Sequence, residues 1–182
     1  MSPRLAQLEA DVARHLDGLY AFALQLARDP QVAERLVADT TLRARDWWEH
    51  FRLGTDLRVW LFTLLYRRYR KERRKSAPAV SDGDLQAAMP GIADLDPEGH
   101  AYEAIADDEI VITLDTLPDE YRVPLLLADF HDFGYAEMAE VLGLPERTLK
   151  ARLFRARQIF QHKLIGYAVA MGRLRLPERA RR

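Results

Sequence analysis

Apolar residues recur at three- and four-residue steps along most of the chain, and no stretch shows the two-residue alternation of a half-buried strand. The first stripe consists of Leu5, Leu8, Val12, Leu16, Leu19, Phe22, Ala23 and Leu26. This spacing places the apolar side chains on one side of an α-helix. The pattern therefore predicts an all-α protein.

Two further helices have clear start signals. Asp29 followed by Pro30 is typical of an N-cap with proline in the first turn, where its missing N–H costs nothing. Asp56 can cap a third helix, which continues into a basic run. The second helix is expected to bury Ala33, Leu36, Val37, Thr40 and Ala44, and the third Leu57, Trp60, Leu61, Leu64 and Leu65. Three or four helices fit residues 1–75.

A change of composition follows this helical region. Residues 76 to about 103 are rich in proline, glycine, acidic and small residues, which cannot bury enough surface to offset the entropy of ordering. Helical spacing returns near Ile105, and Leu117-Pro118 opens a helix that Pro124 is expected to bend. The chain is thus predicted to form two small helical domains joined by an acidic flexible linker.

Residues 135–157 have the pattern of a helix-turn-helix. Ala139 is small enough for two helices to cross closely, and Gly143 can adopt the left-handed conformation of a tight turn. The second helix is expected to begin at Pro145 or Glu146, with a basic outer face suited to the DNA major groove. Its outward residues are Arg147, Thr148, Lys150, Ala151, Arg152 and Arg155. A plain helical hairpin in a bundle is the alternative.

Charge alternates strongly along the chain, although the formal net charge is only -1. Residues 67–75 read RRYRKERRK, residues 76–109 hold nine acidic residues and no Lys or Arg, and residues 147–157 are basic again. Two basic blocks with an acidic connector indicate two surfaces that bind polyanions. Each block taken alone could instead be a solvated helix face.

The cysteine, histidine and apolar content of the chain argues against several classes of protein. The chain has no cysteine, its five histidines are scattered, and its longest apolar run, Val59–Tyr66, is far too short to span a bilayer. No nucleophile elbow, phosphate loop or metal set is present in the sequence. We therefore expect a soluble cytoplasmic protein that is not an enzyme, holds no cofactor or metal and does not insert into membranes.

Motifs in both helical parts of the sequence resemble those of a known protein family. Residues 111–164 are similar to region 4 of the extracytoplasmic-function sigma factors, within the sigma-70 family. The residues that carry this similarity are Leu117-Pro118, Tyr121-Arg122, Tyr135, Glu137–Glu140, Leu142-Gly143 and Thr148–Arg157. Residues 15–75 resemble region 2 of that family through Ala33-Glu34, Leu36-Val37, Leu42–Ala44, Trp60-Leu61 and the closing arginines. The resemblance implies region 2 over residues 1–75, a linker over 76–106, region 4 over 107–172 and a basic tail over 173–182.

The resemblance also implies partners: core RNA polymerase, bound through its beta-prime clamp helices and beta flap, promoter DNA, and an anti-sigma factor. The second helix would bind the clamp helices through Glu34, Arg35, Ala38, Asp39 and Arg43. Region 2 would open the minus-10 element and capture an unstacked base in the loop of residues 50–56. Its contacts would be Phe51, Arg52, Asp56, Arg67, Arg70, Lys71 and Arg74. Region 4 would read the minus-35 element through the six outward residues after Pro145.

The sequence departs from the family at the clamp-binding helix, where Arg35 replaces the usual acidic residue and Ala38 the usual glutamine. One hypothesis is that phosphorylation of Thr40 or Thr41 restores negative charge there. The tryptophans Trp47, Trp48 and Trp60 are interpreted as core residues, with base stacking as the alternative. Two other functions remain open: a sigma-like mimic that binds an anti-sigma factor without recruiting polymerase, and a helix-turn-helix repressor.

Overall fold

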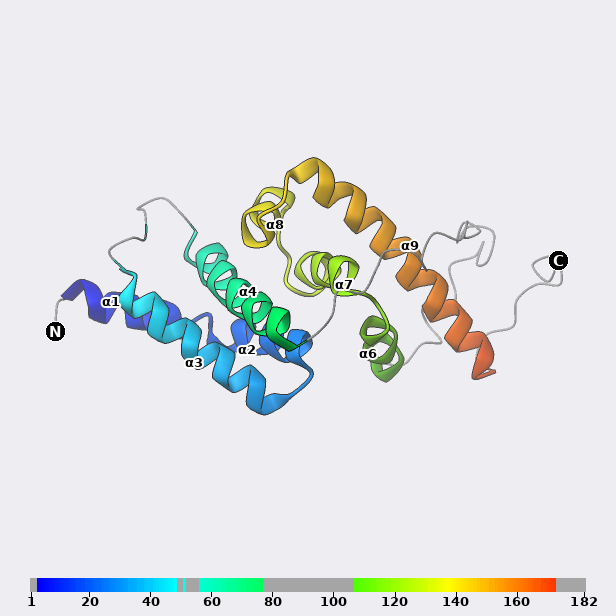
Figure 1. Ribbon diagram of the computed structural model, residues 1–182, viewed down its shortest axis with the longest axis horizontal. Helices are drawn as coiled ribbons and strands as arrows, with labels where there is room; N and C mark the ends of the chain where they lie inside the picture. Colours follow the sequence, from blue (N-terminus) through cyan, green and yellow to red (C-terminus); the bar gives the residue numbers. More distant parts are fainter. Residues whose placement is uncertain (1–2, 49–50, 52–55, 77–106, 173–182) are drawn as a thin grey trace. The chain divides into compact units, whose positions relative to one another are not determined.

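The computed structural model describes residues 3–48, 51, 56–76 and 107–172, and every regular element within those ranges is helical (Figure 1). The elements are α1 (Pro3–Ala13), α2 (Leu16–Ala27), α3 (Pro30–Asp46), α4 (Leu57–Ser76), α6 (Asp107–Asp115), α7 (Asp119–Leu125), the π-helical turn η4 (Leu126–Phe130), α8 (Tyr135–Leu142) and α9 (Glu146–Ala170). The predicted all-α class is confirmed. The predicted linker and basic tail lie outside the described residues.

The chain forms two compact units, one from Met1–Ala79 with Leu126–Leu149 and the other from Val80–Leu125 with Lys150–Arg182. The helices α1 to α4, η4 and α8 thus belong to the first unit. The helices α6 and α7 and most of α9 belong to the second. The domain bounds derived from the sequence (1–75, 76–106, 107–172 and 173–182) stay predictions.

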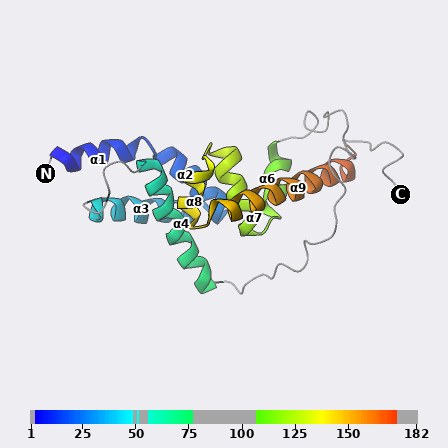
Figure 2. The ribbon, with the colours of Figure 1, turned by 90° about the horizontal axis from the view of Figure 1, so that it is seen from above.

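The core of the first unit is built by α2, α3 and α4, and α4 crosses α3 obliquely (Figure 2). Phe22 of α2 and Phe62 of α4 stack with ring centroids 5.1 Å apart, and Leu36 of α3 is fully buried. Each such side chain contributes about 1.5–3 kcal/mol when it leaves water. The helix α4 is buried on more sides than its apolar stripe predicts, because α8 packs against it as well as α2 and α3.

Local signals place the helix starts as predicted. Asp29 Oδ1 accepts hydrogen bonds from the backbone N–H groups of Gln31 (2.8 Å) and Val32 (3.1 Å). Asp56 Oδ1 accepts from the N–H of Arg58 (2.7 Å) in the same way. The long first stripe is divided between two helices, since α1 ends at Ala13 and α2 begins at Leu16.

The second unit contains a buried cation. The Arg122 guanidinium in α7 is 1 % exposed and pairs with Asp119 at 2.8 Å and Asp115 at 3.5 Å. Pro124, which the sequence predicts to bend this helix, lies inside α7, and the π-helical turn η4 begins two residues later. Loss of a backbone donor at proline is a common cause of such a change in hydrogen-bond pattern.

Candidate nucleic-acid and polymerase interfaces

The helix-turn-helix has the predicted turn. Gly143 caps α8 with φ of 66°, and the N–H of Leu144 donates to the carbonyl of Ala139 at 3.1 Å. At the other end of α8 the carboxylate of Glu137 accepts from the N–H of Gly134 at 2.7 Å. The following helix α9 begins at Glu146, one of the two predicted starts. The predicted start of α8, the turn at Gly143 and the start of the second helix are therefore confirmed, while α9 continues to Ala170, beyond the predicted end of the motif at residue 157.

The outer face of α9 carries cations and one large aromatic residue. Of the six predicted DNA contacts, Arg147, Lys150 and Ala151 are exposed, while Thr148, Arg152 and Arg155 are half-buried. The exposed row also contains Phe154, with 66 % of its surface open to solvent. Phe154 was not among the predicted contacts, because large apolar residues of a helix usually face inward. Its spacing of three and four residues from Ala151 and Lys150 is the signal that places it on the same face.

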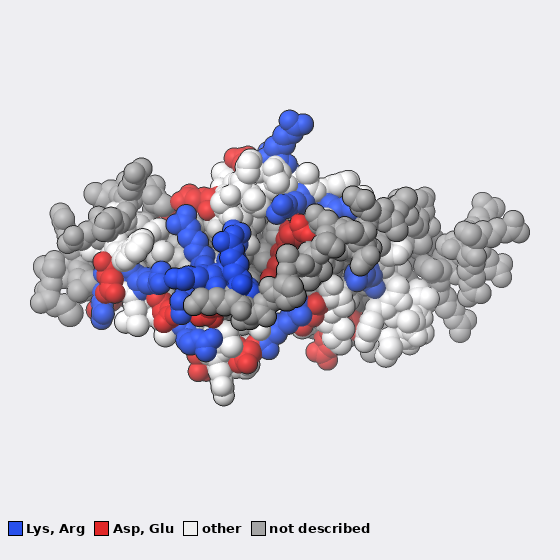
Figure 3. All heavy atoms as spheres, viewed as in Figure 1, with Lys and Arg blue, Asp and Glu red and all other residues white. Residues whose placement is uncertain are grey.

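A second cationic face runs along α4. The predicted minus-10 contacts Arg67, Arg70, Lys71 and Arg74 are all exposed, and Arg67 and Arg74 each lie three and four residues from the adjacent pair Arg70 and Lys71. Arg70 also lies over the ring of Tyr66, with 5.8 Å from guanidinium carbon to ring centroid. Figure 3 shows Lys and Arg side chains gathered over this helix. The row is long enough to follow a DNA strand over two helical turns of protein.

Aromatic rings flank the predicted base-capturing loop. Phe51 stacks on Trp48 (centroids 5.9 Å apart) and lies against Trp60 (5.1 Å), so one ring bridges the end of α3 and the start of α4. Trp48 and Trp60 are half-buried, but Trp47 is 54 % exposed, and its interpretation as a core residue is wrong. Arg52 lies outside the described residues.

The carboxylate of Asp56, another predicted minus-10 contact, caps α4 as described above. Cap formation uses Oδ1 of this carboxylate. The side chain is exposed, so it lies at the boundary between the loop and the basic helix. Asp56 thus determines the residue at which α4 begins. The start of the helix in turn determines which direction its basic side chains face.

The predicted polymerase-binding face lies on α3. Glu34, Arg35, Ala38 and Arg43 are exposed, and Asp39 is half-buried. Two of the five are engaged within the protein, because Arg35 pairs with Glu72 of α4 at 3.4 Å and Asp39 pairs with Arg68 of α4 at 2.8 Å. Arg68 and Glu72 are themselves 3.0 Å apart. These four residues, the α3–α4 ion-pair network, were not predicted as a group.

Thr40 and Thr41 differ sharply in accessibility. Thr40 is fully buried, and its hydroxyl donates to the carbonyl of Leu36 at 2.7 Å. A phosphate at Thr40 cannot be accommodated in the folded protein, so the hypothesis of phosphorylation fails there. Thr41 is half-buried and donates to the carbonyl of Ala38 at 2.9 Å, which leaves it as the remaining candidate.

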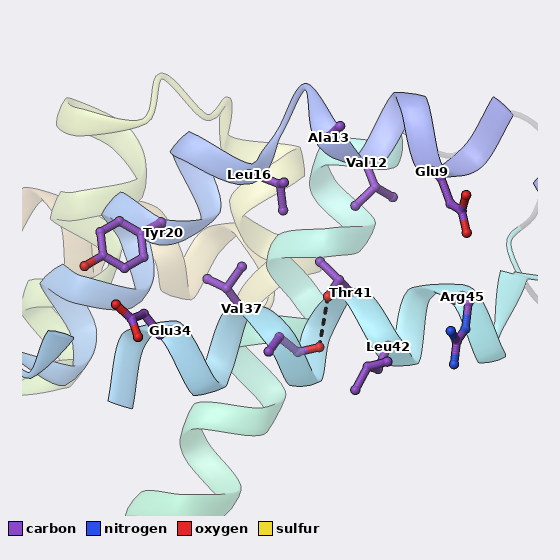
Figure 4. Close-up of a pocket in the computed structure, with 11 residues that line it drawn as sticks. Glu9, Val12, Ala13, Leu16, Tyr20, Glu34, Val37, Thr41, Leu42 and Arg45 are labelled. Carbon is purple, nitrogen blue, oxygen red and sulfur yellow. Dashed lines mark hydrogen bonds between the residues drawn. The ribbon is translucent and has the colours of Figure 1, made fainter. Parts of the chain in front are cut away.

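A groove of about 520 Å³ lies between α1 and α2 on one side and α3 on the other (Figure 4). Val12 and Leu16 point across it toward Val37 and Thr41. Glu34 and Ala38, both predicted to bind polymerase, are among its lining residues. The predicted clamp-binding face is therefore hollowed and partly apolar rather than flat and charged.

The described part of the chain has neither a metal-ion site nor a membrane-spanning helix. Within it, no group of three or more His, Asp or Glu residues could hold a metal ion. None of its helices has the length and apolar character required to cross a membrane.

Comparison with known proteins identifies the two regions. Residues 12–78 match the model of sigma-70 region 2, and residues 108–159 match that of sigma-70 region 4. The ECF RNA polymerase sigma factor EcfG of Rhodopseudomonas palustris is 32% identical over 155 residues, which are 85% of this chain and 83% of that protein. The ECF RNA polymerase sigma factor SigL of Mycobacterium tuberculosis is 30% identical over 81% of this chain and 83% of its own length.

Solved structures share the fold. The sigma factor RpoE of Bartonella quintana, determined in complex with the anti-sigma factor NepR, superposes with a TM-score of 0.66 over 88% of this chain and 97% of that chain, at 24% identity. CnrH, determined in complex with the cytosolic domain of CnrY, gives 0.64 at 21% identity, over 87% of this chain and 88% of that chain. Given the matches to both sigma-70 regions and to relatives over 83% of their length, the chain belongs to the ECF family of RNA polymerase sigma factors, non-enzymatic proteins that direct transcription initiation.

Proposed function

We propose that this sigma factor binds core RNA polymerase through α3 and holds promoter DNA at two separate surfaces, the basic face of α4 and the outer face of α9. The observation that best supports this proposal is that each of the two matched regions has an exposed row of cationic side chains on one helix. Cationic rows of this kind gain affinity for DNA by releasing condensed counterions from phosphates.

The α4 surface is suited to the minus-10 element. Arg67, Arg70, Lys71 and Arg74 would bind backbone phosphates, and Phe51, held between Trp48 and Trp60, would form one wall of the pocket for an unstacked base. Flipping a base costs a few kcal/mol, and stacking on aromatic rings offsets about 1–3 kcal/mol of that per base. Arg52 and Asp56 complete the proposed set.

The α9 surface is suited to the minus-35 element as duplex. Arginine and lysine bind guanine edges or phosphates in the major groove, and an apolar side chain contacts the methyl group of thymine. We therefore add Phe154 to the proposed contacts Arg147, Thr148, Lys150, Ala151, Arg152 and Arg155. The half-buried Arg152 and Arg155 are the more constrained of the arginines, which suits them to fixed base contacts.

The polymerase contact is proposed for the exposed part of α3, with Glu34, Ala38 and Arg43 toward the beta-prime clamp helices and region 4 toward the beta flap. We also propose an anti-sigma factor as a partner, since the structural neighbours RpoE and CnrH were determined with NepR and CnrY. The groove beside α3 has the apolar lining that a helix of such a partner requires.

One observation favours a second function. Arg35 and Asp39 are engaged in the α3–α4 ion-pair network, which leaves fewer charges for polymerase than the family pattern has. A sigma-like mimic that binds an anti-sigma factor and never recruits polymerase would tolerate this. The cationic faces of α4 and α9 support the function of a sigma factor that binds promoter DNA, because a mimic that only binds an anti-sigma factor does not require DNA contacts. We also propose that the chain catalyses no reaction and acts in the cytoplasm with the polymerase.

Run-off transcription with purified core polymerase on a library of genomic fragments tests the proposal. The expected result is core-dependent transcripts that start at a shared promoter sequence, together with co-elution of the chain and the polymerase. Absence of association with core polymerase would favour the mimic. Association of the chain with promoter fragments alone, as a dimer, would favour a repressor.

A further inference from the structure

Arg68 lies beside the cationic row of α4, which consists of Arg67, Arg70, Lys71 and Arg74, but its side chain is turned away from that row. It follows Arg67 directly and precedes Lys71 by three residues, a spacing that makes Arg68 and Lys71 neighbours on the helix surface. The four residues of the row are exposed, whereas only 25% of the Arg68 side chain is open to solvent. Arg68 is thus a cation at the edge of the proposed DNA surface that is engaged elsewhere.

Two carboxylates from different helices hold the Arg68 guanidinium. Asp39 of α3 lies 2.8 Å from its Nη2, and Glu72, one turn further along α4, lies 3.0 Å from the same atom. The carboxylate of Glu72 is divided between two arginines, since its other oxygen lies 3.4 Å from Arg35 of α3. Asp39 is therefore the closer partner of Arg68 and the main reason why its side chain points toward α3.

The contacts of Arg68 satisfy its guanidinium only in part. Its Nε is buried and has no hydrogen-bond partner among the residues that the structure describes, and an unpaired buried donor costs free energy. The side chains of Asp39 and Glu72 are 31% and 26% exposed, so solvent screens both ion pairs. A DNA phosphate can accept two parallel hydrogen bonds from a guanidinium. Phosphate can therefore compete for Arg68 once one of the two carboxylates is withdrawn.

Asp39 is also accessible to a partner of the factor. It is one of the five residues of α3 that are predicted to bind polymerase, and nearly a third of its side chain stays open to solvent while it pairs with Arg68. The adjacent Ala38 and, one turn further along α3, Arg43 are exposed. A partner that binds this face meets the Asp39 carboxylate, and a cationic group of that partner would compete with Arg68 for it.

We propose that Arg68 is a further DNA-binding cation of α4, which Asp39 holds back in the free factor and which turns to a DNA phosphate when polymerase pairs with Asp39. The DNA surface of α4 thus gains one positive charge in the polymerase-bound state. By linkage, DNA bound at Arg68 frees Asp39 and raises the affinity for polymerase by the same factor. The inference goes beyond the proposed function and rests on it, since α3 has to bind polymerase and α4 has to bind DNA.

The free, full-length chain tests the role of Asp39 without polymerase. Phosphate contacts carry no sequence information, so a fluorescent single-stranded dT oligonucleotide, titrated at several salt concentrations, serves as the probe. Asp39→Asn should steepen the slope of log affinity against log salt by about 0.7, the value for one additional phosphate on a single strand. The double variant Asp39→Asn with Arg68→Gln should return to the wild-type slope. An unchanged slope in folded Asp39→Asn would overturn the proposal.

Two control variants separate the release of Arg68 from a general change of charge. Glu34→Gln removes an exposed acidic charge from the same helix but leaves the α3–α4 ion-pair network intact, so it should keep the wild-type slope. Equal steepening in Glu34→Gln and Asp39→Asn would overturn the proposal, because it would show a loss of repulsion alone. Arg68→Lys in the Asp39→Asn background keeps the cation and should keep the steeper slope, and a return to the wild-type slope there would contradict a phosphate contact.

The holoenzyme tests the release by polymerase itself. On a promoter fragment recovered by run-off transcription, Arg68→Gln should make the salt slope of the holoenzyme shallower by about 0.7–0.9, the value for one lost phosphate. In the free chain the same variant should leave the slope on the dT oligonucleotide unchanged. Arg70→Gln, in the exposed row, should make the slope shallower in both states. Circular dichroism identifies a variant that fails to fold, and if Asp39→Asn does so, Arg68→Gln carries the result. An equal effect of Arg68→Gln in both states would overturn the proposal.

The outcomes distinguish this inference from the proposed function. If Arg70→Gln has its expected effect and Arg68→Gln has none in the holoenzyme, α4 is a DNA surface and the role of Arg68 is overturned. If neither variant changes the slope in either state, α4 does not bind DNA, and the proposed function fails at that surface together with the inference. Failure of the wild-type chain to bind core polymerase would overturn the proposed function, and the free-chain comparison of Asp39→Asn with Glu34→Gln would still decide whether Asp39 holds Arg68 back.

Discussion

The carboxylate of Asp39 on α3 lies 2.8 Å from the guanidinium of Arg68 on α4, so an ion pair joins the helix proposed to bind polymerase to the helix proposed to bind DNA. Glu72 extends the link, since it pairs with both Arg68 and Arg35. Arg35, which stands where the family has an acidic residue, thus has a carboxylate partner on α4. The charge on the polymerase-binding face is set jointly by two helices.

Replacing Arg68 with methionine should destabilise the first unit by about 1 kcal/mol, because Asp39 and Glu72 lose a shared partner while solvent screens part of the loss. The expected change is modest because the three side chains are 25–31% exposed. Urea denaturation measures it. Arg45→Met is the matched control, since Arg45 is exposed and its ion pair is with the adjacent Asp46 of the same helix. Equal losses in both variants would show that the network contributes nothing.

Phe154→Ala should weaken binding to the cognate minus-35 duplex by about 1 kcal/mol and leave binding to unrelated duplex unchanged, because a thymine methyl contact is specific to sequence. Arg152→Ala should cost about 1–3 kcal/mol on the cognate duplex if it makes a bidentate base contact. Fluorescence anisotropy on both duplexes gives the two affinities. Gln158→Ala, exposed one turn further along α9, is the control. An equal loss on unrelated duplex would assign Arg152 to a phosphate.

Replacing Arg70 and Lys71 with alanine should reduce open-complex yield and lower the slope of log affinity against log salt by about one for each phosphate that the variant no longer binds. Titrations of the holoenzyme on promoter DNA at several salt concentrations measure the slope. Arg45→Ala removes an exposed cation outside the α4 row and should leave it unchanged. An unaltered slope in the double variant would remove α4 from the DNA interface.

Gly143→Ala should destabilise the helix-turn-helix by about 1–2 kcal/mol, because the backbone there has φ of +66°. A Cβ at this position meets nothing within 4 Å, so the cost comes from the backbone alone. Gly143→Asn should be tolerated better, since asparagine adopts the left-handed conformation more readily. Thermal denaturation compares the two. Equal stability of all three proteins would contradict the assigned turn.

The stability of the first unit should fall with acidity, because His131, between η4 and α8, is buried with its Nε2 2.7 Å from the side-chain oxygen of Gln25. The pKa of His131 is about 4 in the folded chain against 6.5 when exposed, so the unfolded chain takes up a proton first as pH falls. The contribution of the neutral imidazole is therefore complete above about pH 6.5 and is lost between there and pH 4. From pH 7.5 to 5.5 the expected loss is roughly 1 kcal/mol. Urea denaturation at several pH values measures it, and His131→Gln should remove this part of the pH dependence.

Features encoded by neighbouring residues could be predicted from the sequence. The starts of α3 and α4, the Gly143 turn and the start of α9 depend on caps and backbone preferences within a few residues, which the sequence displays directly. The exposed cations of α4 follow from helical spacing in the same way. The two cationic rows and the all-α class could therefore be inferred from residue order alone, and the family resemblance added the roles.

Contacts between residues far apart in the chain were decided only by the tertiary structure. Nothing local distinguishes the exposed Trp47 from the buried aromatic residues, because the surface that would cover its ring belongs to another helix. Arg35 meets Glu72, and His131 meets Gln25 over 106 positions, only once packing has set the helices side by side. Hydrophobic spacing fixes which face of a helix turns inward; which helix it then meets depends on the assembled core.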